Sequence, residues 1–433
     1  MDNAKRAPEI TGKINAEPNR IPFGQGRVLI RWETNDPGGA EIRVSTGPGN
    51  EKLVSQGGPS GRMEIPWIAD STVYEFRLYA VGQPDKPIAS VKVKRDFNAA
   101  TTILRDLTEQ VTRGNIGVTE LSQFIATLMP LCLRGANFRE TFRLWEQHGF
   151  HVTPVHFYEP IPDTRCLPET LWDRPSELVG INMNDAMQLD LLRNHFPKFR
   201  PEYDQFPTKP TENPARFYLT NGVFDGMDAL VAYCIVRHFQ PRVIVEVGGG
   251  NSSLILGQAL AKNNNPNLIC VEPFPSDFLR NGFPGLKSLV IKKVQEVELD
   301  FFSQLQSADI LFIDSSHTVK IGGDVNYLFL EVLPRLNPGV IVHVHDIFLP
   351  LDYRRTWVMD ELRFWTEQYL LQTFLSFNSE FEVLMADGYL GRRYMEDLKA
   401  TFMNSPWWGG VSFWMRRRPP EASRRPVYNS NAI

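Results

Sequence analysis

The strongest constraint on the fold is a short apolar run that ends in three consecutive glycines. Residues 243–251 read V-I-V-E-V-G-G-G-N, and apolar residues at helical spacing continue from Asn251 to Leu260. A strand that passes through glycines into a helix lets a ligand approach the backbone closely, because glycine has no side chain. In an α/β sheet, ligands bind at the carboxyl ends of such strands.

Further apolar runs alternate with helical patterns along the rest of the chain. Residues 224–239 have helical spacing, and short apolar runs follow at residues 268–274, 308–317 and 339–348. A long helical pattern from Thr356 to Phe377 precedes two last strands, at residues 381–386 and 410–416. This alternation predicts an α/β fold with a parallel sheet that is covered on both faces.

The first hundred residues follow a different pattern, with a period of two. Alternating apolar residues occupy positions 28–32, 42–44, 74–80 and 89–93, and turn-forming clusters such as NDPGG and QGGPSG separate them. Short strands at this spacing predict a β-sandwich. The Val-x-Ile-x-Trp and Tyr-x-Phe-x-Leu-x-Ala strands resemble those of fibronectin type III and immunoglobulin-like modules.

We therefore expect four segments along the chain. These are an all-β sandwich at 1–97, a helical and then proline- and aromatic-rich lid segment at 98–215, the α/β domain at 216–418 and a flexible tail at 419–433. The many aromatic residues between 151 and 214 argue against a solvated linker. We expect that stretch to pack on the following domain, over its site.

The charge and composition limit the classes of partner that the chain can bind. The net charge is -4, so no basic field exists to hold nucleic acid. No apolar run approaches the ~20 residues that span a bilayer. The four cysteines are scattered without a C-x-x-C pair, which fits a reduced compartment. We expect a cytoplasmic protein whose partner is neither nucleic acid nor a membrane.

Two acidic residues end later strands of the predicted sheet. Glu272 follows the glycines at about the spacing of 20 residues where a carboxylate binds both hydroxyls of a ribose. Asp314 ends a later strand. The loop is not the G-x-G-x-x-G dinucleotide fingerprint, because Ser253 stands where its third glycine would fall.

With these residues, the stretch 217–416 resembles the class I S-adenosylmethionine-dependent methyltransferases. The resemblance implies a Rossmann-like sheet whose last two strands form a reversed C-terminal hairpin, and S-adenosylmethionine as cofactor. It also implies a set of cofactor-binding residues, in which Glu246 supports the loop, Gly248 and Gly250 lie against the methionine part, Glu272 binds the ribose and Gln295 lies near the adenine. Asn251, Ser252 and Asp314 complete this set.

A second motif suggests metal chemistry at the same sheet edge. Asp314 begins D-S-S-H, which ends at His317, and H-V-H-D runs from His343 to Asp346. Carboxylates with nearby imidazoles can hold Mg²⁺ or another divalent cation, and His317 can act as general base. The motif resembles metal-dependent O-methyltransferases that act on small molecules and sugars. Catechol-type enzymes have Asp-Asn at the second place, whereas Ile347 follows Asp346 here.

The resemblance therefore implies Asp314, His345 and Asp346 as metal ligands, with His345 in place of the missing Asn. The alternative is that Asp314 only contacts the cofactor or caps a turn. His343 and His345 face the same side of one strand, so they are core histidines if a helix covers that side.

The predicted reaction is O-methylation of a small-molecule hydroxyl on a sugar, a phenol or a natural product. The alternatives are N- or C-methylation on the same fold, or a catalytically inactive protein that binds a partner or another nucleoside. The sequence identifies neither the acceptor nor the oligomeric state, and a homo-oligomer stays open.

Overall fold

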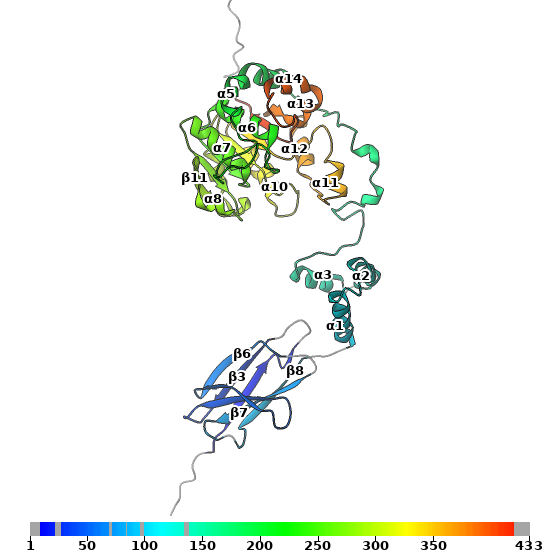
Figure 1. Ribbon diagram of the computed structural model, residues 1–433, viewed down its shortest axis with the longest axis vertical. Helices are drawn as coiled ribbons and strands as arrows, with labels where there is room; N and C mark the ends of the chain where they lie inside the picture. The colour runs from blue at the N-terminus through cyan, green and yellow to red at the C-terminus, as the bar shows by residue number, and fades with distance from the viewer. Residues whose placement is uncertain are drawn as a thin grey trace, which may run out of the picture. The chain divides into compact units, whose positions relative to one another are not determined.

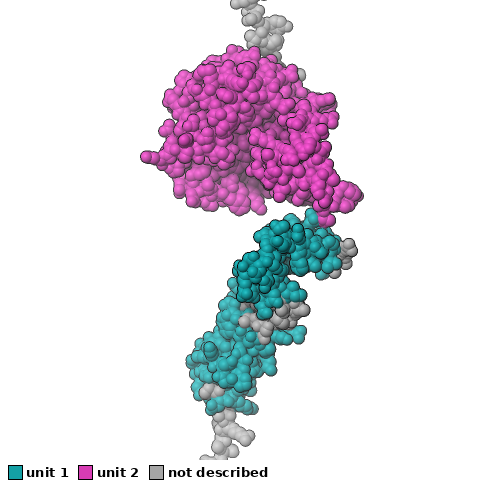
Figure 2. All heavy atoms as spheres, turned by 45° about the vertical axis from the view of Figure 1, so that its right-hand side comes forward, with its two compact units in different colours: residues 1–153 teal, residues 154–433 magenta. Residues whose placement is uncertain are grey.

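The computed structural model describes residues 9–21, 27–68, 72–83, 85–95, 99–133 and 138–419. The chain divides into two compact units, residues 1–153 and residues 154–433 (Figures 1 and 2). The predicted segment at 98–215 is therefore shared between the two units. The predicted tail lies outside the described residues, except for Pro419.

Unit 1 begins with two β-sheets that share one core. The first has the order β1-β3-β6 and the second the order β2-β8-β7-β4-β5. Ile30 and Trp32 of the first sheet pack with Phe76 and Leu78 of the second, so the period of two does create a sandwich. The elements of this unit are β1 (Gly12–Glu17), β2 (Arg20–Ile21), β3 (Val28–Thr34), β4 (Ala40–Ser45), β5 (Lys52–Gly57), β6 (Ser60–Ile65), β7 (Val73–Ala80), β8 (Ala89–Arg95), α1 (Ala99–Thr112), α2 (Val118–Cys132) and α3 (Phe138–Gln147).

Unit 2 is built on one seven-stranded sheet with helices on both faces (Figure 1). Its strands are β9 (Ile244–Val247), β10 (Leu268–Val271), β11 (Leu286–Val290), β12 (Ile310–Ile313), β13 (Ile341–Val344), β14 (Phe381–Ala386) and β15 (Phe413–Arg417). Its α-helices are α4 (Asp185–Asp190), α5 (Arg200–Tyr203), α6 (Gly226–Phe239), α7 (Asn251–Lys262), α8 (Asp277–Asn281), α9 (Leu299–Ser303), α10 (Asp324–Tyr327), α11 (Arg355–Met359), α12 (Glu367–Leu375), α13 (Asp387–Arg393) and α14 (Met395–Thr401).

The central strands are apolar throughout because both of their faces are buried. In β12, Ile310 and Phe312 belong to the core beneath α6 and α7. Leu311 and Ile313 belong to the opposite core, to which α12 contributes Leu371. Successive side chains of a strand alternate between faces, so an unbroken apolar run is what a doubly covered sheet requires.

The strand order places a ligand crevice at one point of the sheet edge. The order is β11-β10-β9-β12-β13-β15-β14, and the first five of these strands run parallel. The chain moves outward in one direction from β9 and in the other from β12, so their following loops diverge, and such a switch point binds ligands. β15 pairs antiparallel with both β13 and β14, as expected for the two late strands.

The aromatic-rich stretch packs on the sheet of unit 2 from α4 onward. Leu191, Phe196 and Tyr203 are buried in the core that α6 and α7 cover. The Tyr203 hydroxyl donates to the backbone oxygen of Thr401, 2.7 Å away. By contrast, Phe157 is 81% exposed, so the earlier part of the stretch contributes little to that core.

The long helix predicted from Thr356 to Phe377 is wrong. The structure has α11 and α12, with an irregular turn between them. Leu362 in that turn has a φ of 57°, a left-handed conformation that interrupts a helix. The backbone amides of Thr366 and Glu367 donate to the His317 carbonyl at 2.9 and 3.1 Å, so α12 begins where the loop after β12 holds it.

Among the described residues, no helix is both long and apolar enough to cross a membrane.

We expect the second unit to fold without the first. Among the described residues, the buried side chains that form the cores of unit 2 all lie beyond residue 177, with Leu167 and Trp172 packed against them, and the sandwich core ends at Val93. A chain that begins at residue 154 should therefore unfold in one cooperative urea transition, followed by circular dichroism. A broad, non-cooperative transition would contradict this independence.

Candidate functional site

The glycine loop contacts the loop after β12 directly. Gly248 follows β9 with a φ of 88°, and a Cβ at this position would lie 1.7 Å from the backbone oxygen of Asp314. The amide of Asp314 in turn donates to the Val247 oxygen at 2.9 Å. Glycine is therefore required at 248 by both conformation and space.

A buried carboxylate supports the loop from below. Glu246 has no exposed surface and accepts hydrogen bonds from the hydroxyls of Ser252 and Ser253 and from the Cys270 thiol. The Gly250 amide donates to the Ser253 hydroxyl at 3.0 Å. Burial raises the pKa of the Glu246 carboxyl to about 7. Glu246 thus orders the turn and the start of α7 without facing a cavity.

The first cavity lies over the ends of β9, β10 and β12 and has a volume of about 480 Å³. Four of the residues expected to bind the cofactor border it, namely Gly248, Glu272, Gln295 and Asp314. The Phe274 amide donates to Glu272 Oε1 at 2.7 Å, which orients this carboxylate. Gly250, Asn251 and Ser252 do not line this cavity in the structure.

Three ligand-type side chains meet at the ends of β12 and β13. One oxygen each of Asp314 and Asp346 and one ring nitrogen of His317 all lie within 4.8 Å of one another. His317 Nε2 is 3.3 Å from Asp314 Oδ1 and 3.4 Å from Asp346 Oδ2. We call these three residues the cluster. Two oxygens and one nitrogen form a donor set for a hard or borderline divalent cation.

His317 is oriented by a residue that the sequence analysis missed. Its Nδ1 hydrogen-bonds Glu367 Oε2 at 2.9 Å, and Glu367 is fully buried. The Trp365 ring packs on the imidazole with centroids 4.3 Å apart. A carboxylate at Nδ1 fixes the ring so that Nε2 faces the other two carboxylates. The sequence pattern predicts one continuous helix over residues 356–377, and such a helix gives no indication that Glu367 contacts His317.

The backbone of the cluster is unusual in two places. His317 and Asp346 both have left-handed φ angles, of 56° and 57°. Non-glycine residues occupy this region at a cost, and such residues concentrate at functional sites. Both of these side chains lie close to Asp314.

The two other histidines of the second motif have different surroundings. His345 Nδ1 lies 3.7 Å from Asp314 and 3.6 Å from Asp346, so the ring adjoins the cluster. His343 is stacked on Phe312 at 3.8 Å, and its Nε2 lies 3.0 Å from the Ser412 hydroxyl. His343 is therefore a core histidine, whereas His345 belongs to the site.

The charged groups of the cluster shift one another's pKa values. Burial alone would lower the pKa of His317, but hydrogen bonds with Asp314 and Glu367 raise it to about 10. Burial would likewise raise the pKa of Asp314, but His345 and His317 hold it well below its ordinary value. Without a cation, the cluster therefore has a charged imidazolium between carboxylates at neutral pH.

A second cavity of about 860 Å³ opens on the other side of Asp314. His317, His345 and Asp346 line it, together with the rings of Trp357, Trp365 and Trp407. Asp314 borders both the first and the second cavity. Asp314 thus adjoins two cavities, each large enough for part of a small molecule, while His317 and Asp346 line only the second.

Comparisons with known proteins identify a domain in the same part of the chain. A sequence family described as a methyltransferase domain matches residues 245–347, which include Glu246, Glu272 and the whole cluster. An uncharacterized protein of Archaeoglobus fulgidus is 34% identical over 166 residues, which cover 35% of this chain and 73% of that protein.

Two solved structures show weaker likenesses. A Thermobifida fusca YX protein, named for a proposed methyltransferase activity, has a TM-score of 0.27 and 12% identity, covering 44% of this chain and 82% of its own. The apo form of the Calx CBD1 domain has a TM-score of 0.13 and 17% identity, covering 19% of this chain and 98% of its own. Both scores are low, so the fold assignment rests on the sheet order and the sequence family. The chain belongs to the same family as the Archaeoglobus fulgidus protein, and it carries a methyltransferase domain.

Proposed function

We propose that the chain is an S-adenosylmethionine-dependent methyltransferase that methylates a hydroxyl of a small molecule with the help of a divalent cation. One observation carries the proposal: Asp314 borders both cavities, and the other two cluster residues line the second. A methyl donor in the first cavity and an acceptor in the second would meet at this residue. Methyl transfer requires such in-line placement of donor and acceptor.

The first cavity fits an adenosine-containing donor. Glu272 presents a half-buried carboxylate at the end of β10, where two ribose hydroxyls can donate to it. Gly248 borders the same cavity and has no side chain that would occupy it. Phe274 adds an exposed ring to the lining and Gln295 an amide, next to the place expected for the adenine.

The cluster fits a cation, and the acceptor hydroxyl needs activation. Asp314, His317 and Asp346 supply the three donors, and Glu367 holds His317 in position. A bound divalent cation would lower the pKa of an acceptor hydroxyl and orient it. The Trp357, Trp365 and Trp407 rings give the second cavity a wall that suits a sugar or aromatic acceptor.

His317 has two proposed roles that use the same nitrogen. The sequence suggests a general base, and the geometry adds a ligand role, since Nε2 faces both Asp314 and Asp346. A nitrogen that binds a cation cannot accept a proton. The two roles therefore exclude one another, and the cation requirement of a His317 variant distinguishes them.

Binding of S-adenosylmethionine tests the proposal. Glu272→Gln should weaken binding of the donor about 5- to 150-fold, measured by isothermal titration calorimetry, because a charged acceptor of ribose hydroxyls contributes roughly 1–3 kcal/mol. Glu296→Gln is the matched control, since this exposed carboxylate lies outside the cavity lining. Equal affinities of the wild type and Glu272→Gln would refute the assigned donor site.

A further inference from the structure

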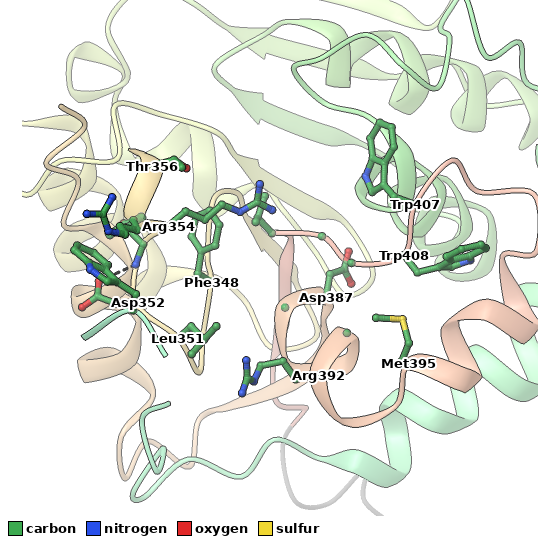
Figure 3. A pocket seen from close by; sticks show the side chains of 18 residues that line it. Phe348, Leu351, Asp352, Arg354, Thr356, Asp387, Arg392, Met395, Trp407 and Trp408 are labelled. Atoms are coloured by element: carbon green, nitrogen blue, oxygen red, sulfur yellow. Dashed lines mark hydrogen bonds between the residues drawn. The ribbon is translucent and has the colours of Figure 1, made fainter. Parts of the chain in front are cut away.

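A third cavity of about 520 Å³ adjoins the second one. Both cavities are bordered by Arg354, Trp407 and the Gly409–Val411 segment (Figure 3). The third cavity does not reach the cluster, because no residue of the cluster lines it. An acceptor whose hydroxyl lies in the second cavity can therefore extend into the third.

Two of the arginines around these cavities are neutralised by carboxylates. Arg355 donates to both oxygens of Glu169, at 3.0 and 3.1 Å. Arg363 forms an ion pair with Glu361 at 2.7 Å. These guanidinium groups already have their partners and need no ligand.

Two further arginines that line the third cavity have no carboxylate partner among the described residues. The Arg354 guanidinium lies over the rings of Phe348 and Trp357, 5.3 and 5.9 Å from their centroids. Figure 3 shows Arg354 and Arg392 approaching the cavity from different elements, the segment before α11 and helix α13. Ring stacking holds Arg354 without neutralising it, so its planar donors remain available.

The acidic residues of the third cavity do not cancel this charge. Asp387 is fully buried, and burial followed by its neighbour Asp228 raises the pKa of this carboxyl well above its ordinary value, which favours the neutral form. Asp352 is the remaining acid of the lining, and its Oδ1 accepts from the Tyr369 hydroxyl at 2.5 Å. Two guanidinium groups without a carboxylate partner among the described residues thus line the cavity with Asp352 as the one acid besides the buried Asp387.

We propose that Arg354 and Arg392 bind an oxyanion, carboxylate or phosphate, that the methyl acceptor carries at a distance from its reacting hydroxyl. Arginine suits this role because its planar fork donates two parallel hydrogen bonds to such a group. The rings of Trp172, Trp407 and Trp408 border the same cavity and can cover the body of the molecule. This inference rests on the proposed function, since it names the kind of acceptor.

The test compares three sugars that differ in one group. The chain of 433 residues is titrated with glucose, glucuronate and glucose 6-phosphate by isothermal titration calorimetry. EDTA is present so that no cation bridges the anion to the cluster. We expect at least one acidic sugar to bind about 10- to 100-fold more tightly than glucose, as charge-assisted hydrogen bonds allow. Preference for glucuronate identifies a carboxylate, and preference for glucose 6-phosphate a phosphate.

Substitutions show which arginine causes the preference for an acidic sugar over glucose. Arg354→Gln should abolish it and Arg354→Lys should keep part of it, whereas Arg355→Gln, at the neighbouring paired arginine, should leave it intact. Equal affinity for all three sugars, or equal losses in Arg354→Gln and Arg355→Gln, would overturn the inference. S-adenosylmethionine is titrated into the same samples. Donor binding without an oxyanion preference removes only this inference, and absence of donor binding removes the proposed function.

Discussion

Gly248→Ala should abolish binding of S-adenosylmethionine and destabilise unit 2. The added Cβ would lie 1.7 Å from the Asp314 backbone oxygen, so the two loops at the switch point would have to separate. The φ of 88° adds strain for any residue with a side chain. We expect a loss of about 2–4 kcal/mol in the free energy of unfolding, measured in urea, from strain and lost contacts together.

Gly250→Ala provides the matched control. A Cβ at 250 would meet no atom within 4 Å, and the φ of -165° is extended. This variant should therefore keep the wild-type free energy of unfolding. Donor affinity in Gly250→Ala tests the predicted contact with the methionine part of the cofactor. Wild-type donor affinity in Gly248→Ala would show that the cofactor does not use this loop.

The sheet was predictable because its signals are local. An unbroken apolar run identifies a doubly buried strand, and a turn of glycines marks its end, so β9, β12 and β13 follow from the sequence alone. The meeting of Asp314 with Asp346 was predictable for the same reason, since parallel strands bring their carboxyl ends to one edge.

The support of the cluster was not predictable, because it depends on contacts distant in sequence. Glu367 is 50 residues from His317. The helical spacing of apolar residues across 356–377 cannot reveal that the helix is interrupted. In the structure the backbone amide of Thr366 instead donates to the carbonyl of His317, in the loop after β12. The neutral or charged state of a carboxyl such as Asp387 likewise depends on burial beside Asp228, which no local pattern contains.

Removal of divalent cations should abolish methyl transfer. After dialysis against EDTA we expect activity to fall at least about 100-fold, because an aliphatic hydroxyl is a poor nucleophile unless its pKa is lowered. Mg²⁺ or Mn²⁺ should restore it. Asp346→Asn should raise the cation concentration that gives half-maximal activity. Asp225→Asn is the control and should leave that concentration unchanged, because Asp225 lines the same cavity but lies outside the cluster. Full activity after exhaustive chelation would rule out the cation.

The pH dependence of cation binding then assigns His317. In the cation-free protein the pKa of its imidazole is about 10, so the ring is protonated at neutral pH. If Nε2 is a ligand, each bound cation displaces that proton, and Mn²⁺ affinity should rise about tenfold per pH unit between pH 6.5 and 8.5. His317→Ala should then flatten this slope and raise the cation requirement. If His317 is instead the base, His317→Ala should lower kcat about 10²- to 10⁴-fold at an unchanged cation requirement. An alanine variant with wild-type kcat, slope and cation requirement would exclude both roles and leave His345, 3.6 Å from Asp346, as the next imidazole to test.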